Sequence, residues 1–167
     1  MTMVLTVFLA IVFCAAMALM LISCVAFIQD NKFFSSAPKE AREVLIQREQ
    51  ELFYGARAIG WSLFIISILM ILGVGVIAVW DGFRSGFAFP EFFVRFVLIF
   101  TVYKICDMAL IDYFLLLKFH FFQHYYPEAE HVMEGRTYGF NIKSQLLKLF
   151  VIFPAVSALA AWICTLF

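Results

Sequence analysis

Residues 92–118 read FFVRFVLIFTVYKICDMALIDYFLLLK, and the rest of the predicted fold is arranged around this segment. It is long and apolar enough to cross a bilayer as one helix. Lys104, Asp107 and Asp112 nevertheless lie inside it. Because ionisable groups are costly at bilayer depth, such side chains face the interior of a helix bundle and are candidates for function. The stretch therefore predicts a membrane-spanning helix that packs among other helices.

The composition of the whole chain is typical of a membrane protein. Of its 167 residues, 65% are hydrophobic and 14% are charged, whereas a soluble domain is about half apolar and about a quarter charged. The apolar residues are concentrated in long runs, which indicates membrane spans rather than a soluble core. The formal net charge is +0, so nothing attracts nucleic acid electrostatically, and we exclude that class of partner.

Four apolar segments are predicted to span the membrane, at about residues 3–28, 58–80, 91–117 and 146–167. The first has no positively charged start and is too long for a signal peptide, so we expect it to be uncleaved. In the fourth, Pro154 is expected to kink the helix. The fold class is therefore an all-α integral membrane protein, a four-transmembrane-helix bundle that forms a single membrane domain over residues 1–167.

The connections between the spans are two polar loops, over residues 30–57 and 118–143, and one short turn. In the first loop, residues 38–53 place apolar side chains opposite charged ones at helical spacing, which predicts a short amphipathic helix. It would lie on the membrane surface or against a partner, although an extension of the following span explains the pattern equally well. The short turn is predicted from four breaker residues: Asp81, Gly82, Ser85 and Gly86.

The distribution of positive charge predicts the orientation. Eight Lys and Arg residues lie in the two polar loops: Lys32, Lys39, Arg42, Arg48, Arg57, Lys118, Arg136 and Lys143. The short turn has only Arg84 and Arg95 beside it. Because positively charged loops remain in the cytoplasm, we expect both loops to be cytoplasmic and both termini to be extracytoplasmic, in a plasma or inner membrane.

The charged residues of the third span form the first candidate site, a binding site. Lys104 and Asp107 are three residues apart and close enough for a local ion pair. Asp112 lies about 140° around the helix from Asp107, at ~100° per residue, and must find another partner. The three residues either bind an ion or polar solute or form a structural clamp between helices. At the start of this helix, Glu91 and Arg95 have the spacing of a pair.

The second candidate site is a metal site in the second polar loop. His120 and His124 are four residues apart and would share one face of a helix, where they could hold a divalent metal together with Glu128 or His131. Exposed histidines at the membrane interface are the alternative. Five aromatic residues of the same region resemble an interfacial belt: Phe119, Phe121, Phe122, Tyr125 and Tyr126.

The remaining motifs leave the function open. The four cysteines, Cys14, Cys24, Cys106 and Cys164, lie in apolar runs without C-x-x-C spacing and are expected to be free buried thiols. No motif for nucleophilic catalysis, phosphate binding or dinucleotide binding is present.

Three functions are compatible with the sequence. The first is a binding or transport component, or a subunit of a membrane complex, that uses the charges of the third span. The second is a membrane-embedded enzyme, with or without a metal, that acts on lipid at the cytoplasmic face. The third is a scaffold or assembly factor. Its partner, another protein or a second copy of the chain, would contact the membrane helices or the 38–53 helix.

Overall fold

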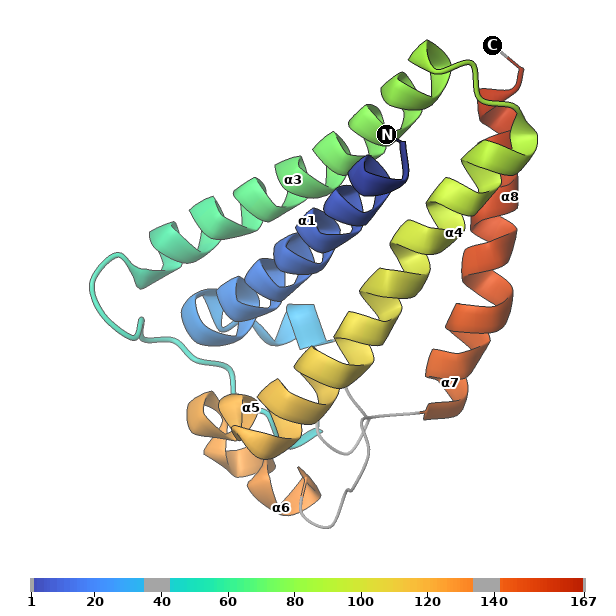
Figure 1. The fold of residues 1–167 in the computed structure, drawn as a ribbon. Coiled ribbons are helices and arrows are strands. Elements are labelled where there is room, and N and C mark those ends of the chain that lie inside the picture. The colour runs from blue at the N-terminus through green and yellow to red at the C-terminus, as the bar shows by residue number, and fades with distance from the viewer. Residues whose placement is uncertain (1, 35–42, 134–141, 167) are drawn as a thin grey trace. The chain divides into compact units, whose positions relative to one another are not determined.

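The computed structural model describes residues 2–34, 43–133 and 142–166. Within these residues the secondary structure is helical, without strands (Figure 1). The elements in chain order are α1 (Thr2–Ile22), η1 (Ser23–Ile28), η2 (Asn31–Phe34), α3 (Ala56–Arg84), α4 (Phe89–Cys106), η3 (Asp107–Lys118), α5 (Phe121–Tyr125), η4 (Pro127–Ala129), α6 (Glu130–Met133), α7 (Ile142–Leu147), η5 (Lys148–Ile152) and α8 (Phe153–Cys164). Of these, η1, η3 and η5 are π-helical, and η2 and η4 are 3₁₀ helices.

Three helical stretches are long and apolar enough to cross a membrane: Met3–Ile28, Ala56–Arg84 and Ser144–Cys164. They correspond to the first, second and fourth predicted spans. The third predicted span is helical, as α4 and η3, but it is not one of the three apolar stretches found in the described residues. Its α-helical part carries Glu91, Arg95 and Lys104 within 18 residues. The described residues thus show an all-helical, membrane-compatible fold with three candidate membrane-spanning helices.

The chain divides into two compact units, each with its own apolar core. Unit 1 comprises Met1–Ala16, Leu69–Asp107 and Asn141–Phe167. Unit 2 comprises Met17–Ile68 and Met108–Phe140. The long helices α1 and α3 contribute residues to both units.

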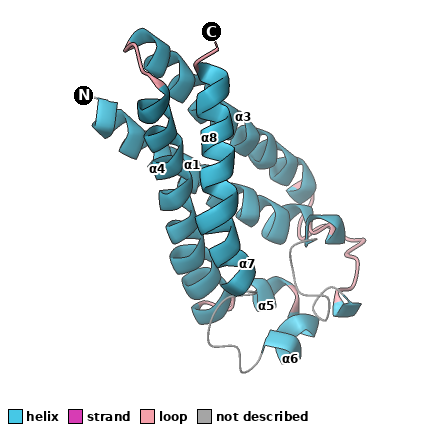
Figure 2. Ribbon diagram, turned by 90° about the vertical axis from the view of Figure 1, so that its right-hand side faces the viewer, coloured by secondary structure: helices cyan, strands magenta, loops and turns pink. Residues whose placement is uncertain are grey.

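The core of unit 1 is built around α4, which packs along α8 (Figure 2). Segments of α1 and α3 complete the core. Three of its buried residues are alanines, Ala10, Ala78 and Ala161, and small side chains let helices approach closely. The larger core side chains are Leu9, Val74, Phe92, Phe96 and Ile99.

The turn between α3 and α4 is shorter than predicted, because α3 continues through Asp81 and Gly82 to Arg84. Only residues 85–88 lie outside the two helices, and Gly86 adopts a positive φ of 67°. Gly82 lies within the helix, and the ring of Phe92 packs so closely against it that a Cβ atom there would overlap the ring. The prediction that Asp81 and Gly82 belong to the turn was therefore wrong.

Arg95 pairs with Asp81 rather than with Glu91. Its buried guanidinium lies 2.7 Å from the Asp81 carboxylate, donates a hydrogen bond of 2.8 Å to the carbonyl of Ala78, and lies 4.3 Å from the centre of the Phe87 ring. Glu91 instead accepts a hydrogen bond of 3.0 Å from the backbone N–H of Ala88 at the start of α4. These contacts neutralise Arg95 and attach α4 to the end of α3.

The helix that contains Pro154 is irregular in the turn before it. Pro154 lies in the first turn of α8, and the preceding turn, η5, is π-helical. The N–H of Phe153 bonds to the carbonyl of Lys148, five residues back. Proline has no N–H and crowds the carbonyl four residues before it. A wider turn relieves that crowding, so the irregularity expected at Pro154 takes the form of a π-helical turn.

In unit 2, the segment after Val44 is not the predicted amphipathic helix. Residues 43 and 44 are helical, residues 45–53 are not, and residues 38–42 lie outside the described residues. Side chains bind the backbone of this segment in place of helical hydrogen bonds: Asn31 binds the carbonyl of Leu45, Glu128 the N–H of Ile46, and Arg57 the carbonyls of Arg48 and Glu49. The helix prediction was wrong for residues 45–53 because these distant partners satisfy the backbone groups.

The aromatic residues of the second polar loop do not all lie at a surface. Phe122 and Tyr126 are buried in the core of unit 2 with Val25, Leu45 and Ala129. Their rings stack with centroids 4.9 Å apart. Burial raises the pKa of the Tyr126 hydroxyl well above its usual value. The prediction that Phe122 and Tyr126 lie in an interfacial belt was therefore wrong. Phe119, another residue of the predicted belt, is exposed.

Gly60 allows the start of α3 to approach η1 closely. The hydroxyl of Ser23 donates a hydrogen bond of 2.8 Å to the carbonyl of Gly60. A Cβ atom at Gly60 would lie 2.8 Å from side-chain atoms of both Phe27 and Ile28. Both neighbours are in unit 2, so this contact is part of its packing.

We predict that Gly60→Ala destabilises the protein, whereas Gly73→Ala does not. The added methyl group at position 60 overlaps two side chains, and overpacking of this kind costs about 1–3 kcal/mol. At Gly73 nothing lies within 4 Å of the added atom, and alanine is favoured over glycine in a helix by up to ~1 kcal/mol. Equilibrium unfolding in mixed micelles measures both variants. Equal unfolding midpoints would contradict the close approach at Gly60.

Candidate functional site

Lys104 and Asp107 form the ion pair that their spacing predicted. Only 4% of the Lys104 side chain is exposed, against 16% of the Asp107 side chain. The ammonium group is therefore buried, while the carboxylate retains some access to the surroundings. A buried charge is tolerated when a partner and hydrogen bonds replace the lost solvation, and here the partner is one turn away on the same helix.

The helix changes geometry at Asp107. The α-helix α4 ends at Cys106, and the π-helical η3 begins at the next residue. The N–H of Asp107 bonds to the carbonyls of both Lys104 and Tyr103. π-Helical turns are rare and frequently occur at functional sites. The ion pair therefore lies at the point where α4 departs from regular geometry.

Asp112 is the third residue of the predicted binding site. Its backbone belongs to η3, within unit 2, and its side chain lies outside the described part of the structure. The structure brings together Lys104 and Asp107, and the prediction for the Asp112 side chain falls outside the described residues.

The structure also brings together two cysteines that the sequence did not connect. Cys14 on α1 lies near Cys106 and Asp107, beside the contact of the Phe13 and Tyr103 rings, whose centroids are 5.1 Å apart. We call Cys14, Lys104, Cys106 and Asp107 the polar cluster. All four belong to unit 1. The only sequence signal for the proximity of the two cysteines is that both residues lie within apolar helices, which is too general to predict it.

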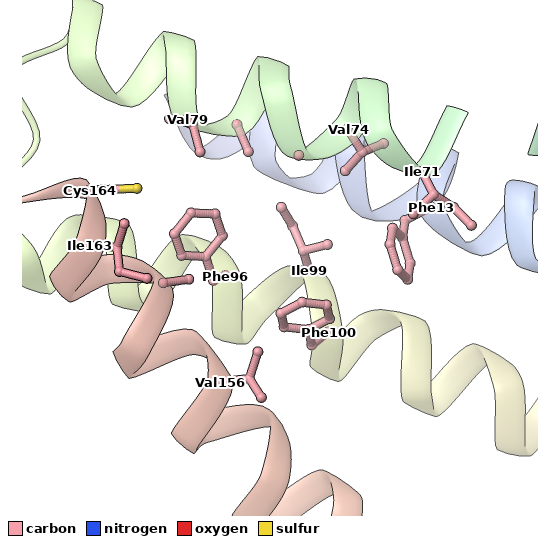
Figure 3. A pocket seen from close by; sticks show the side chains of 13 residues that line it. Phe13, Ile71, Val74, Val79, Phe96, Ile99, Phe100, Val156, Ile163 and Cys164 are labelled. Carbon is pink, nitrogen blue, oxygen red and sulfur yellow. The ribbon is translucent and has the colours of Figure 1, made fainter. Parts of the chain in front are cut away.

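An apolar cavity of about 500 Å³ lies within unit 1, among α1, α3, α4 and α8 (Figure 3). Its lining comes from Phe13 on α1; Ile71, Val74, Gly75, Ala78 and Val79 on α3; Phe96, Ile99 and Phe100 on α4; and Val156, Ala160, Ile163 and Cys164 on α8. None of these side chains is charged or carries a hydroxyl. Because buried water needs polar partners, this cavity suits hydrocarbon.

One face of α4 connects the cavity to the polar cluster. Phe96 and Phe100 line the cavity, and Lys104 follows Phe100 by four residues. Side chains four residues apart lie on the same face of a helix. The ring of Phe13, next to Cys14 in the chain, contacts Phe100 with ring centroids 6.0 Å apart. The site therefore combines an apolar volume with a pair of opposite charges that begins one helical turn further along α4.

The predicted metal ligands lie in unit 2 and are not gathered into a metal site. Glu128 forms an ion pair of 2.7 Å with Arg48. His120 has a positive φ of 49° and precedes α5, while His124 and His131 are exposed. In the residues that the structure describes, no group of three or more His, Cys, Asp and Glu side chains is positioned to hold a metal.

Comparisons of the chain with protein-family models, curated proteins and solved structures find no match.

We predict that the Lys104–Asp107 pair contributes to stability as a unit. Lys104→Met or Asp107→Leu alone leaves one charge buried without its partner, which costs about 3–5 kcal/mol. The double variant K104M/D107L removes both charges. Its free energy of unfolding is expected to lie within ~1–2 kcal/mol of that of the original protein. Unfolding in mixed micelles measures the cycle, and Lys148→Met, at an exposed lysine, is the matched control. If the destabilisations of the two single variants add up to that of the double variant, the two charges are not coupled.

Proposed function

We propose that the protein is an integral membrane protein that binds an amphipathic molecule within unit 1. The hydrocarbon part would occupy the apolar cavity, and the polar part would contact the Lys104–Asp107 pair. The observation that carries the proposal is the single face of α4 that runs from the cavity-lining Phe96 and Phe100 to Lys104. This makes it a binding or transport type of membrane protein, in which intramembrane charges serve the ligand.

Membrane insertion is supported by the surface of the helices. Large apolar side chains are exposed along the three apolar stretches, among them Phe8, Leu69 and Leu159. In this proposal α4 and η3 form a fourth span. Two of the charged residues of α4 have partners that reduce the cost of insertion, since Arg95 is paired with Asp81 and Lys104 with Asp107. The positively charged loops then lie in the cytoplasm, with both termini on the opposite side.

The charge of the site determines the class of ligand. The Lys104–Asp107 pair has no net charge, so an ionic head group would leave an unbalanced charge in an apolar environment. A neutral or zwitterionic polar group can donate to the carboxylate without this cost. Transfer of the ligand's hydrocarbon part from the lipid bilayer to the apolar cavity releases little free energy, because both surroundings are equally apolar. Selection among lipids would therefore come from packing in the cavity and from the polar contact.

Binding of a lipid acyl chain in the cavity can be tested by photolabelling. The protein is reconstituted into nanodiscs that contain a zwitterionic phospholipid with a diazirine on its acyl chain, and the photolabelled peptides are identified by mass spectrometry. We expect labelling of peptides that contain Phe13 and Val156. Gly75→Leu should reduce this labelling several-fold because Gly75 lines the cavity and a Cβ atom there meets open space.

Gly73→Leu is the matched control for this experiment. It adds the same side chain to the same helix at a position that also has open space but does not line the cavity. Equal labelling of the original protein and both variants would contradict binding in the cavity.

The polar contact is tested with K104M/D107L, which keeps the apolar packing. We expect the labelled zwitterionic lipid to lose about tenfold in apparent affinity, the effect of ~1.4 kcal/mol, while labelling by a diazirine-bearing alkane is unchanged. Competition with unlabelled lipid measures both affinities. Unchanged affinity for the zwitterionic lipid would show that the two charges serve only to pack the helix, as in a scaffold.

A further inference from the structure

Four aromatic side chains of unit 1 form a closed cycle of ring contacts, which we call the aromatic partition: Phe13 on α1, Phe100 and Tyr103 on α4, and Phe153 at the start of α8. The Phe13 ring contacts those of Phe100 and Tyr103, with centroids 6.0 and 5.1 Å apart. The Phe153 ring contacts the same two rings, with centroids 5.3 and 6.3 Å apart. Because aromatic pairs at these separations attract each other, the partition joins three helices at one level.

One side of the partition faces the apolar cavity. Phe13 and Phe100 line the cavity, and Phe13 lies at the end opposite Cys164 (Figure 3). Tyr103 and Phe153 are not among the lining residues, and their rings pack against the two rings that are. The partition therefore closes this end of the cavity.

The other side of the partition faces the ion pair. Lys104 follows Phe100 by four residues on α4, and Asp107 follows Tyr103 by four. Side chains at this spacing are neighbours on one face of a helix, so each charged residue lies one turn beyond a ring of the partition. A ligand that extends along α4 from the cavity to the pair must therefore pass these rings.

Phe153 is the member of the partition whose backbone is least regular. It is the first residue of α8, and its N–H bonds to the carbonyl of Lys148 across the π-helical η5. Pro154 follows it. Helices bend at prolines and at π-helical turns, whereas the other three rings belong to the α-helices α1 and α4. Phe153 can therefore shift with the smallest loss of helical hydrogen bonds.

We propose that the aromatic partition is a gate with two states. In the closed state, which this structure shows, the four rings separate the cavity from the Lys104–Asp107 pair. In the open state, Phe153 is displaced and the path along α4 is free. The gate rests on the proposed function and regulates the same site, because an amphipathic ligand binds only the open state. A hydrocarbon without a polar part fits in the cavity behind the closed gate.

Phe153→Ala tests the gate in the photolabelling assay in nanodiscs. The variant removes two of the four ring contacts and with them the closed state. The apparent affinity of a ligand for the open state is reduced by the fraction of protein that is open. We therefore expect the affinity for the diazirine-bearing zwitterionic lipid to increase about tenfold, the effect of an open state populated to about 10% in the original protein. Labelling by the diazirine-bearing alkane should remain unchanged.

Phe150→Ala is the matched control. It removes the same ring from η5, three residues before Phe153, where the side chain is exposed and belongs neither to the partition nor to the cavity lining. The affinity for the zwitterionic lipid should be that of the original protein.

Pro154→Ala is a second test, in which all four rings are retained. Alanine restores the backbone N–H that proline lacks, which favours a regular helix at Phe153 and lowers the open fraction. We expect the apparent affinity for the zwitterionic lipid to fall several-fold, the opposite of the change in F153A.

The outcomes distinguish the gate from the proposed function. If the original protein binds the zwitterionic lipid in the cavity, three results would overturn the gate and leave the proposed function in place: an affinity of F153A that is equal or weaker, an equal gain of F153A for lipid and alkane, or an unchanged affinity of P154A. Absence of labelling by the lipid in both the original protein and F153A would overturn the gate and the proposed function together.

Discussion

Inside unit 1, the ammonium group of Lys104 and the carboxylate of Asp107 neutralise each other in otherwise apolar surroundings. Arg95 is held in the same way by Asp81, by a backbone carbonyl and by an aromatic ring. A helix with these buried charges can pack against α8 and line an apolar cavity only if each charge has a partner. The packing of α4, and with it the cavity and the polar cluster, depends on these two ion pairs.

The two ion pairs have different consequences for function. Arg95 is buried and joins α4 to α3, so it acts as a structural clamp. The Lys104–Asp107 pair lies within one helix, retains partial exposure at the carboxylate, and follows the lining of the cavity along α4. A pair that is not needed to join two helices, placed beside an apolar volume, is the better candidate for ligand contact. We therefore propose a binding role for the Lys104–Asp107 pair and a structural role for the Arg95–Asp81 pair.

Unit 2 shows how distant polar side chains can replace local secondary structure. Glu128, predicted as a metal ligand, pairs with Arg48 and accepts a hydrogen bond from the N–H of Ile46. Its carboxylate is thus used to hold residues 45–53 in an irregular conformation over the core that contains Phe122 and Tyr126. The same interactions explain why the amphipathic helix does not extend through these residues and why Glu128 is not gathered with the histidines.

The sequence by itself determined the all-helical class, the three apolar stretches and the Lys104–Asp107 pair, because these depend on hydrophobic run length and on spacing within one helical turn. The tertiary structure alone decided the features that depend on residues far apart in the chain. It gave Arg95 the partner Asp81 instead of Glu91, brought Phe13 of α1 against Tyr103 of α4, and formed the cavity from four helices. Spacing along the chain limits which side chains can meet within one helix. Only the packing of helices selects among partners that lie on different helices.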